Sequence, residues 1–244
     1  MTFESALSQY FPGTVPDRFF LSKTREKLGA LGFYRDNSIA CVGVCRDEIT
    51  RPFVRLVEEA WGEAFNFSSL AGMLFLGKTG MRAAQHHAPS NDDRPRFVYF
   101  AFAHIGISED GTPGKYLRVG QKEPSPACGA LSSLVGKLDR ESYNLDVDVS
   151  DIELSLLKWK LVHLGENEDF QHIVPLTRLT YAIIVADLKD LIRRVEEQEN
   201  SGLSNDYAVL AGIQIHAPNG RDYIWPGEMF ARVSDKIKEI SLSR

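Results

Sequence analysis

The sequence is poor in cysteine and has no long apolar run. Three cysteines in 244 residues are too few for a disulfide framework, and they suit a reducing compartment in which thiols stay free to bind a metal or to react. No apolar stretch approaches the length that crosses a membrane. The first ten residues carry no basic segment, so we predict neither a secretory nor a transit signal and expect a cytoplasmic protein.

Positive charge is also scarce. Lys and Arg number 28 against 33 Asp and Glu, the formal net charge is −5, and no basic block is present. This balance argues against a nucleic-acid partner. Hydrophobic residues make up 43% of the chain, which is enough for a substantial core. Since there is no internal repeat, low-complexity segment or clear linker, we predict one domain over residues 1–244, with a helical arm at about 1–32.

The most informative stretch is Ser38–Arg51. It begins as an apolar run, Ile39–Val44, and then turns abruptly polar. This pattern predicts a buried strand that ends at the carboxyl edge of an open α/β sheet, where ligands and catalytic groups collect. Cys45 would lie where a helix begins, near Asp47 as the N-cap, and the backbone N–H groups there favour a thiolate. A buried cysteine before a capped surface helix is the alternative on this stretch alone.

The remaining pattern is typical of an α/β fold. The most strand-like run is Phe97–Ile107, which is apolar on both faces and therefore predicted to be central, with His104 as its one polar side chain. We expect further strands at 39–44, 73–76, 207–216 and 223–225, a hairpin at 109–119, a loop at 91–95, and helices at 1–10, 17–31, 53–61, 128–138, 151–164 and 176–197.

Soft metal ligands fall at three places that such a sheet could bring together. Cys45 ends one strand, His104 lies late in the central strand, and Cys128 opens a helix. Two thiolates and an imidazole suit Zn²⁺, and three protein ligands with an open fourth position form the catalytic arrangement. The separations of 59 and 24 residues match no local metal motif, and a hydrogen-bonded core histidine is the alternative for His104.

The segments around these ligands resemble one family. Cys45-Arg46-Asp47, F-A-F-A-H-I-G-I, S-P-A-C-G-A-L, A-G-M-L-F-L-G-K-T-G and H-A-P together resemble the limiting-CO2-inducible protein B/C family, which is similar to β-class carbonic anhydrases. The resemblance is strong from about residue 30 to 135. It implies a β-carbonic-anhydrase-like mixed sheet with a parallel core flanked by helices, zinc held by Cys45, His104 and Cys128, and a homodimer.

The implied reaction is the reversible hydration of CO2 to bicarbonate by zinc-bound hydroxide, the lyase reaction of a carbonic anhydrase. In β-class enzymes an Asp after the first Cys, here Asp47, pairs with an Arg. The usual C-x-D-x-R spacing is not met, so Arg46 and Arg51 are both candidates, and a helix headed by Asp47 favours Arg51. His86 or His87 could shuttle protons, and the H-A-P match favours His87.

Other functions remain open. A catalytically silent zinc-binding homologue could act as a scaffold or partner protein. Gly72–Thr79 fits the P-loop pattern, but its intervening residues are large and apolar and residues 67–71 make a poor preceding strand. Cys45–Arg51 fits the C-x5-R pattern of cysteine phosphatases, but Asp47 and Glu48 inside the loop would repel phosphate.

Overall fold

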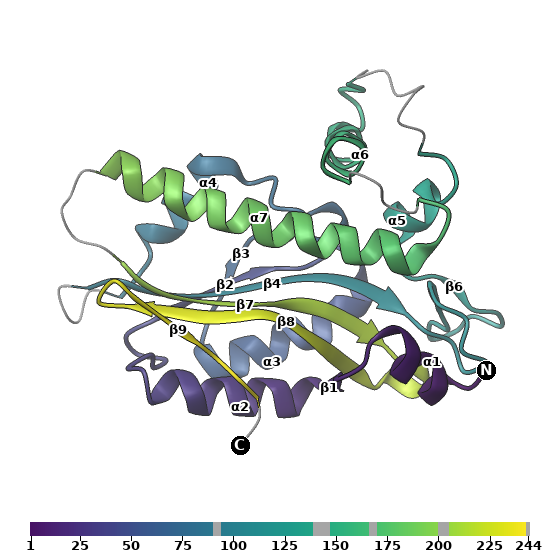
Figure 1. Cartoon of the computed structure of the whole chain (residues 1–244), viewed down its shortest axis with the longest axis horizontal. Helices are drawn as coiled ribbons and strands as arrows, with labels where there is room; N and C mark the ends of the chain where they lie inside the picture. Colours follow the sequence, from purple (N-terminus) through teal and green to yellow (C-terminus); the bar gives the residue numbers. More distant parts are fainter. Residues whose placement is uncertain (90–93, 139–146, 166–169, 200–204, 243–244) are drawn as a thin grey trace.

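A mixed β-sheet runs through the middle of the molecule, with helices on both of its faces (Figure 1). This computed structural model describes residues 1–89, 94–138, 147–165, 170–199 and 205–242. The strand order in the main sheet is β1-β8-β7-β4-β2-β3, and β9 pairs with β8. The predicted α/β class, a mixed sheet with a parallel core flanked by helices, is confirmed.

Parallel strands form the sheet from β7 to its edge strand β3, and antiparallel strands extend it on the other side of β7. The central strand is buried along nearly its whole length, as its apolar sequence predicted. The parallel strands are β2 (Ile39–Gly43), β3 (Phe65–Asn66), β4 (Arg96–Gly106) and β7 (Asp206–His216). The antiparallel strands are β8 (Asp222–Val233), β1 (Val15–Pro16) and β9 (Lys236–Glu239). A separate two-stranded ribbon pairs β5 (Lys115–Tyr116) with β6 (Ser125–Pro126).

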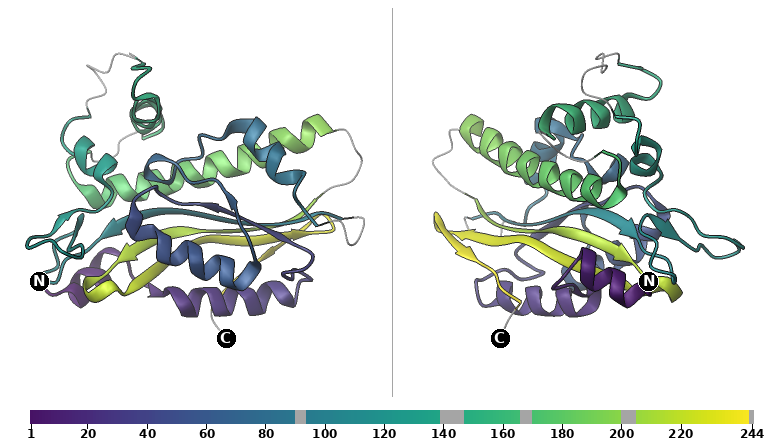
Figure 2. Two further views of the ribbon diagram at one scale, coloured as in Figure 1. Left: turned by 180° about the vertical axis from the view of Figure 1, so that it is seen from behind. Right: turned by 45° about the vertical axis from the view of Figure 1, so that its right-hand side comes forward.

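Two hydrophobic cores lie on opposite faces of the sheet, because successive side chains of a strand point to opposite faces. On β4, Tyr99 and Ala101 enter one core, and Phe100 and Phe102 enter the other. Figure 2 shows the helices of both layers. One face carries α2 (Asp17–Gly29) and α3 (Arg51–Trp61). The other core receives side chains from α1 (Phe3–Tyr10), α4 (Gly77–Gln85), α5 (Gly129–Leu134), α6 (Ile152–Leu164) and α7 (Ile173–Glu199).

The predicted strand at 73–76 is wrong. A short 3-10 turn, Leu70–Gly72, leads into this segment, and Met73 and Leu74 are buried in the core. The backbone here makes local turn bonds, from Met73 N–H to the carbonyl oxygen of Leu70 and from Phe75 N–H to that of Met73, so the apolar run is buried without joining the sheet. A Cβ on Gly72 would lie 2.4 Å from the carbonyl oxygen of Phe102. This glycine therefore allows a close backbone approach, and after β3 a 3-10 turn with buried apolar residues stands where a P-loop would have an open glycine loop.

The predicted hairpin at 109–119 is also wrong in its pairing. Ile107 and Pro113 form a single antiparallel bridge, but Lys115 and Tyr116 pair with β6. β2 pairs only with Phe97–Ala101 of β4, and beyond it the returning chain makes this one bridge and a bond from Gly114 N–H to the carbonyl oxygen of Gly106 before it pairs with β6. Residues 91–93 of the predicted loop lie outside the described residues. Among the described helices, none combines the length and apolar character needed to cross a membrane.

Candidate metal centre

Cys45, His104 and Cys128 lie together at the carboxyl ends of the parallel strands. Their ligand atoms all lie within 4.8 Å of one another, and all three residues are buried. β2 and β4 are parallel neighbours with Gly43 beside Ala101, so the chain leaving β2 reaches Cys45 at the level where β4 carries His104. Cys128 arrives from the other side, at the start of α5.

Local backbone geometry fixes the two cysteines. Cys128 has φ 57° and ψ 77°, a left-handed conformation that costs a non-glycine residue about 1–3 kcal/mol and is found most often at functional sites. Its N–H donates to Oδ2 of Asp47 over 3.3 Å. The hydroxyl of Thr50 donates to the carbonyl oxygens of Cys45 (2.8 Å) and Asp47 (2.9 Å), which closes the loop after β2.

The two thiols at the centre differ in acidity because they share a hydrogen bond. Hydrogen bonding with Cys128 lowers the pKa of Cys45 well below its usual range, although burial opposes this shift. The same hydrogen bond, together with burial, raises the pKa of Cys128. A bound divalent cation would remove this competition, since a coordinating thiol loses its proton. Cys41, deeper in β2, has a pKa raised by burial alone and is a core thiol.

His104 presents one nitrogen to the protein and leaves the other unused. Its Nδ1 lies 3.1 Å from Nε2 of His216. Within the described residues, its Nε2 is a buried polar atom with no hydrogen-bond partner. Such atoms are costly to bury, and a metal ion would satisfy this one. The unused nitrogen, the two sulfurs and their burial fit a soft divalent cation such as Zn²⁺.

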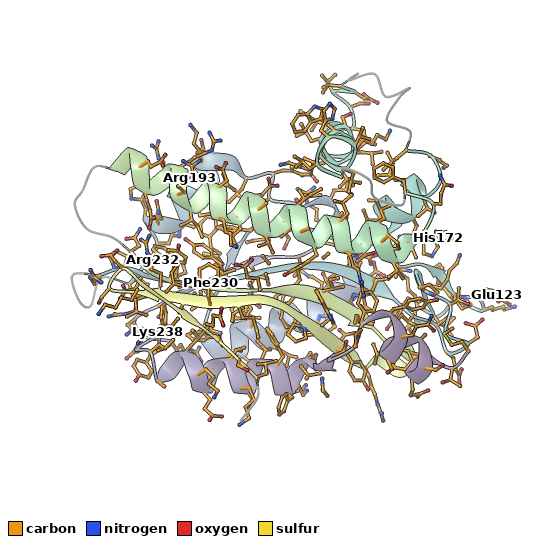
Figure 3. All side chains as sticks on the ribbon, viewed as in Figure 1. Glu123, His172, Arg193, Phe230, Arg232 and Lys238 are labelled. Atoms are coloured by element: carbon orange, nitrogen blue, oxygen red, sulfur yellow. The ribbon has the colours of Figure 1, made fainter. Side chains whose placement is uncertain are left out.

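A carboxylate beside the centre is held by an arginine that the sequence analysis missed. Nη2 of Arg118 lies 3.1 Å from Oδ1 and 3.0 Å from Oδ2 of Asp47. Arg118 also donates from Nε to Glu48 (2.6 Å) and from Nη1 to the carbonyl of Pro126 (2.9 Å). The side chains of Arg118 and Asp47 are 19% and 8% exposed. Arg118 belongs to the segment that connects β5 and β6, which projects from the sheet edge and carries Glu123 (Figure 3).

The predicted pairing of Asp47 with Arg46 or Arg51 is therefore wrong. Asp47 caps the short turn Glu48–Thr50, where its Oδ1 accepts from Ile49 N–H, and this turns its carboxylate away from α3. Arg51 begins α3 and is exposed. Arg46 donates to Glu153 of α6 over 2.6 Å. In sequence, Arg118 is marked only by its place ten residues before Cys128.

Asp47 is ionised in this setting. Burial opposes ionisation, but the positive charge and the hydrogen bonds of Arg118 favour the carboxylate, and the pKa of Asp47 lies below its usual value. With Arg118 bound to both oxygens and the N–H of Cys128 on Oδ2, the carboxylate is fixed in place next to the second cysteine.

The candidate shuttle histidines lie elsewhere. His86 and His87 are exposed at the end of α4, and the ring of His87 packs edge-on against Phe65 with centroids 5.3 Å apart. Phe65 pairs with Cys41 on β2, four residues before Cys45. At the usual rise per residue this places His87 about 13 Å back along the strands from the centre. Within one chain, neither histidine adjoins the cysteines.

The sheet and the Cys-His-Cys group are those of a carbonic-anhydrase-like protein. Residues 14–233 match the family of limiting CO2-inducible proteins B/C beta carbonic anhydrases, and the chain belongs to this family. The crystal structure of limiting CO2-inducible protein LCIB is similar, with 30% identity, coverage of 98% of this chain and 99% of the other, and a TM-score of 0.80. That of PtLCIB4, an LCIB homolog, has 23% identity, coverage of 97% and 99%, and a TM-score of 0.83. A comparison with curated proteins gave no match.

Proposed function

We propose that this chain is a zinc-dependent carbonic anhydrase that reversibly hydrates CO2 to bicarbonate. Cys45, His104 and Cys128 would hold the zinc through Sγ, Nε2 and Sγ and leave one coordination position open. The observation that carries the proposal is the ionised Asp47, which Arg118 fixes directly beside this Cys-His-Cys group. A structural zinc site would need a fourth protein ligand and has no use for such a carboxylate.

Zinc, when bound, would lower the pKa of a coordinated water and so supply a nucleophile for CO2 near neutral pH. The protein would contribute the charged groups that surround this reaction: two thiolates, one carboxylate and one guanidinium. The two thiolates balance the charge of the metal, which lets the centre stay buried. Asp47 would serve as an acceptor that orients the nucleophile by accepting a hydrogen bond from it. Arg118 keeps that carboxylate ionised and restrains it from moving onto the metal itself.

We further propose a cytoplasmic homodimer whose small-molecule substrate is CO2/bicarbonate. The described cysteines are all free, which suits a reducing compartment. Leu117 and Val119 flank Arg118 and are 53% and 106% exposed, so a second copy that packs there would cover apolar surface next to the dyad. Light scattering after size-exclusion chromatography tests the dimer, and replacement of Val119 by Asp should shift it toward monomer.

The test of the proposed function joins metal analysis to a stopped-flow assay of CO2 hydration on the purified chain. We expect one zinc per chain and hydration well above the uncatalysed rate. Zinc without hydration would contradict the enzyme and favour a zinc-binding homologue that acts as a scaffold. A chain that neither contains zinc nor takes it up would contradict the metal centre itself.

A further inference from the structure

Behind the proposed metal centre, a chain of buried polar side chains leads from His104 to the end of β7 and the start of β8. His216, the last residue of β7, lies 3.1 Å from Nδ1 of His104, and its own Nδ1 lies 2.9 Å from Oδ1 of Asp222. The side chains of His216 and Asp222 are 1% and 8% exposed. Gln214 donates from Nε2 to Oδ2 of Asp222 over 3.3 Å and so holds the second carboxylate oxygen.

The strand register builds this chain. β4 and β7 are parallel with His104 beside Gln214 and Gly106 beside His216, which places the two histidines on the same face of neighbouring strands. β7 turns into antiparallel β8 through Pro218–Gly220, and this turn sets Asp222 directly opposite His216. The pairing of the main chains therefore brings the rings of His104 and His216 and the carboxylate of Asp222 into contact.

The donors and acceptors can be arranged consistently in one way. The carboxylate of Asp222 only accepts, so Nδ1 of His216 must carry a proton. Burial favours the neutral ring of His216, whose Nε2 is then an acceptor. Nδ1 of His104 must consequently carry a proton and donate to it. The proton of neutral His104 is thus on Nδ1, and the lone pair on Nε2 is left for a metal.

We propose that His216 and Asp222 are positioning residues that hold His104 in the tautomer and orientation in which Nε2 binds zinc. This inference rests on the zinc centre proposed above. Histidines that bind metals commonly donate their other N–H to a hydrogen-bond acceptor, and loss of that acceptor typically weakens metal binding 10–100-fold. Here the acceptor is itself a histidine that a buried carboxylate fixes in turn.

A purely structural role does not explain why His216 and Asp222 occupy these two buried positions. Both side chains are buried, and each buried polar group costs free energy unless it is hydrogen-bonded. Apolar side chains at these two positions would fill the end of the sheet without that cost. The arrangement is useful because it ends on the one described imidazole nitrogen at the centre that no protein group satisfies.

The test measures metal binding by variants on the full chain. Zinc affinity comes from competition with a chromogenic chelator, and the absorption bands of the Co²⁺-loaded protein report the geometry at the metal. We expect His216→Leu to weaken zinc binding about 10–100-fold and to shift the Co²⁺ bands. His216→Gln keeps an acceptor for His104 and should bind zinc within a few-fold of the wild type.

Two further variants separate positioning from general destabilisation. Thr24→Val removes an equally buried polar group whose hydroxyl bonds within α2, to the carbonyl oxygens of Phe20 and Leu21. It should leave the zinc affinity and the Co²⁺ bands unchanged, even if the metal-free protein melts at a lower temperature. Asp222→Ala retains the rings of His104 and His216. It replaces His216→Leu in the test if that variant does not fold. It should weaken zinc binding because the tautomer of His216 is no longer set.

The outcomes distinguish this inference from the proposed function. Wild-type zinc affinity in His216→Leu, or in Asp222→Ala where the former does not fold, would overturn the positioning role while the zinc centre stands. Equal weakness of His216→Leu and His216→Gln would also overturn it, since the acceptor would then be irrelevant. A wild-type chain that binds neither Zn²⁺ nor Co²⁺ would overturn the zinc centre and the positioning role together.

Discussion

Arg118 binds both carboxylate oxygens of Asp47 across 71 residues of sequence. This contact joins the loop after β2, which carries the first cysteine, to the ribbon that leads to the second cysteine. A single ion pair thereby connects the segments that carry Cys45 and Cys128. It also places the Asp47 carboxylate where the proposed reaction needs a hydrogen-bond acceptor.

Replacement of Arg118 by Ala should lower CO2 hydration by about 100-fold or more, because Asp47 loses the donor that keeps it ionised and in place. Zinc content should stay at one per chain. Arg51→Ala is the matched control, since this exposed arginine begins α3, and its hydration rate should stay near that of the wild type. Stopped-flow rates and metal analysis on both variants decide the point. A larger loss in Arg51→Ala would contradict the pairing.

Zinc should stabilise the folded chain. A ligand that binds only the native state at a concentration 1,000-fold above its Kd adds about 4 kcal/mol, which corresponds to roughly 10 °C in Tm for a chain of this size. Melting curves with and without chelator measure the shift. Cys128→Ser should abolish it, whereas Cys41→Ala should keep it, because Cys41 is a core thiol. An undiminished shift in Cys128→Ser would remove Cys128 from the ligand set.

Gly72→Ala should destabilise the protein by about 2–4 kcal/mol. Its φ is +79°, and an added Cβ would meet the carbonyl of Phe102 on β4 at 2.4 Å. Gly29→Ala is the control, because a Cβ there would make an ordinary van der Waals contact with the Tyr34 ring at 3.7 Å. This substitution should change the free energy of unfolding by no more than about 1 kcal/mol. Urea unfolding of both variants supplies the comparison. Similar free energies of unfolding for the two variants would mean that the backbone around residue 72 adjusts to the added Cβ with little loss of stability, which would contradict this prediction.

Mg-ATP should not bind in the manner of a P-loop protein. Lys78 lies in the first turn of α4, and the segment between β3 and α4 forms a 3-10 turn with buried apolar residues instead of the open glycine loop that cradles phosphates. Isothermal titration calorimetry should show no binding tighter than about 1 mM. Micromolar affinity that disappears in Lys78→Ala would restore the nucleotide hypothesis.

The sequence was most informative where residue type alone determines the environment. Phe97–Ile107 has too many apolar side chains on both faces for any place but the centre of a sheet, and β4 confirms this. Cys45, His104 and Cys128 stood out because two thiols and an imidazole are soft metal ligands. Cys45 and His104 meet because the parallel strands β2 and β4 end at the same edge, and Cys128 joins them from the start of α5.

The sequence was least informative where a contact depends on tertiary register. Arg118 has no local spacing to Asp47, and the search for a partner close in sequence favoured Arg51 for that reason. His216 was predicted only as the end of a strand, since its chemistry depends on the exact pairing with β4 and β8. The apolar run 73–76 was mistaken for a strand because hydrophobicity predicts burial and leaves hydrogen-bonding partners undetermined.

CO2 hydration by Asp47→Asn, measured beside its zinc content, tests the central claim most directly. The amide fills nearly the same volume but lacks the charge that Arg118 holds beside the cysteines. The account predicts one zinc per chain and a hydration rate about 100-fold or more below the wild type. Wild-type turnover across neutral pH would contradict it, and Asp47 would then be only the cap of the turn Glu48–Thr50.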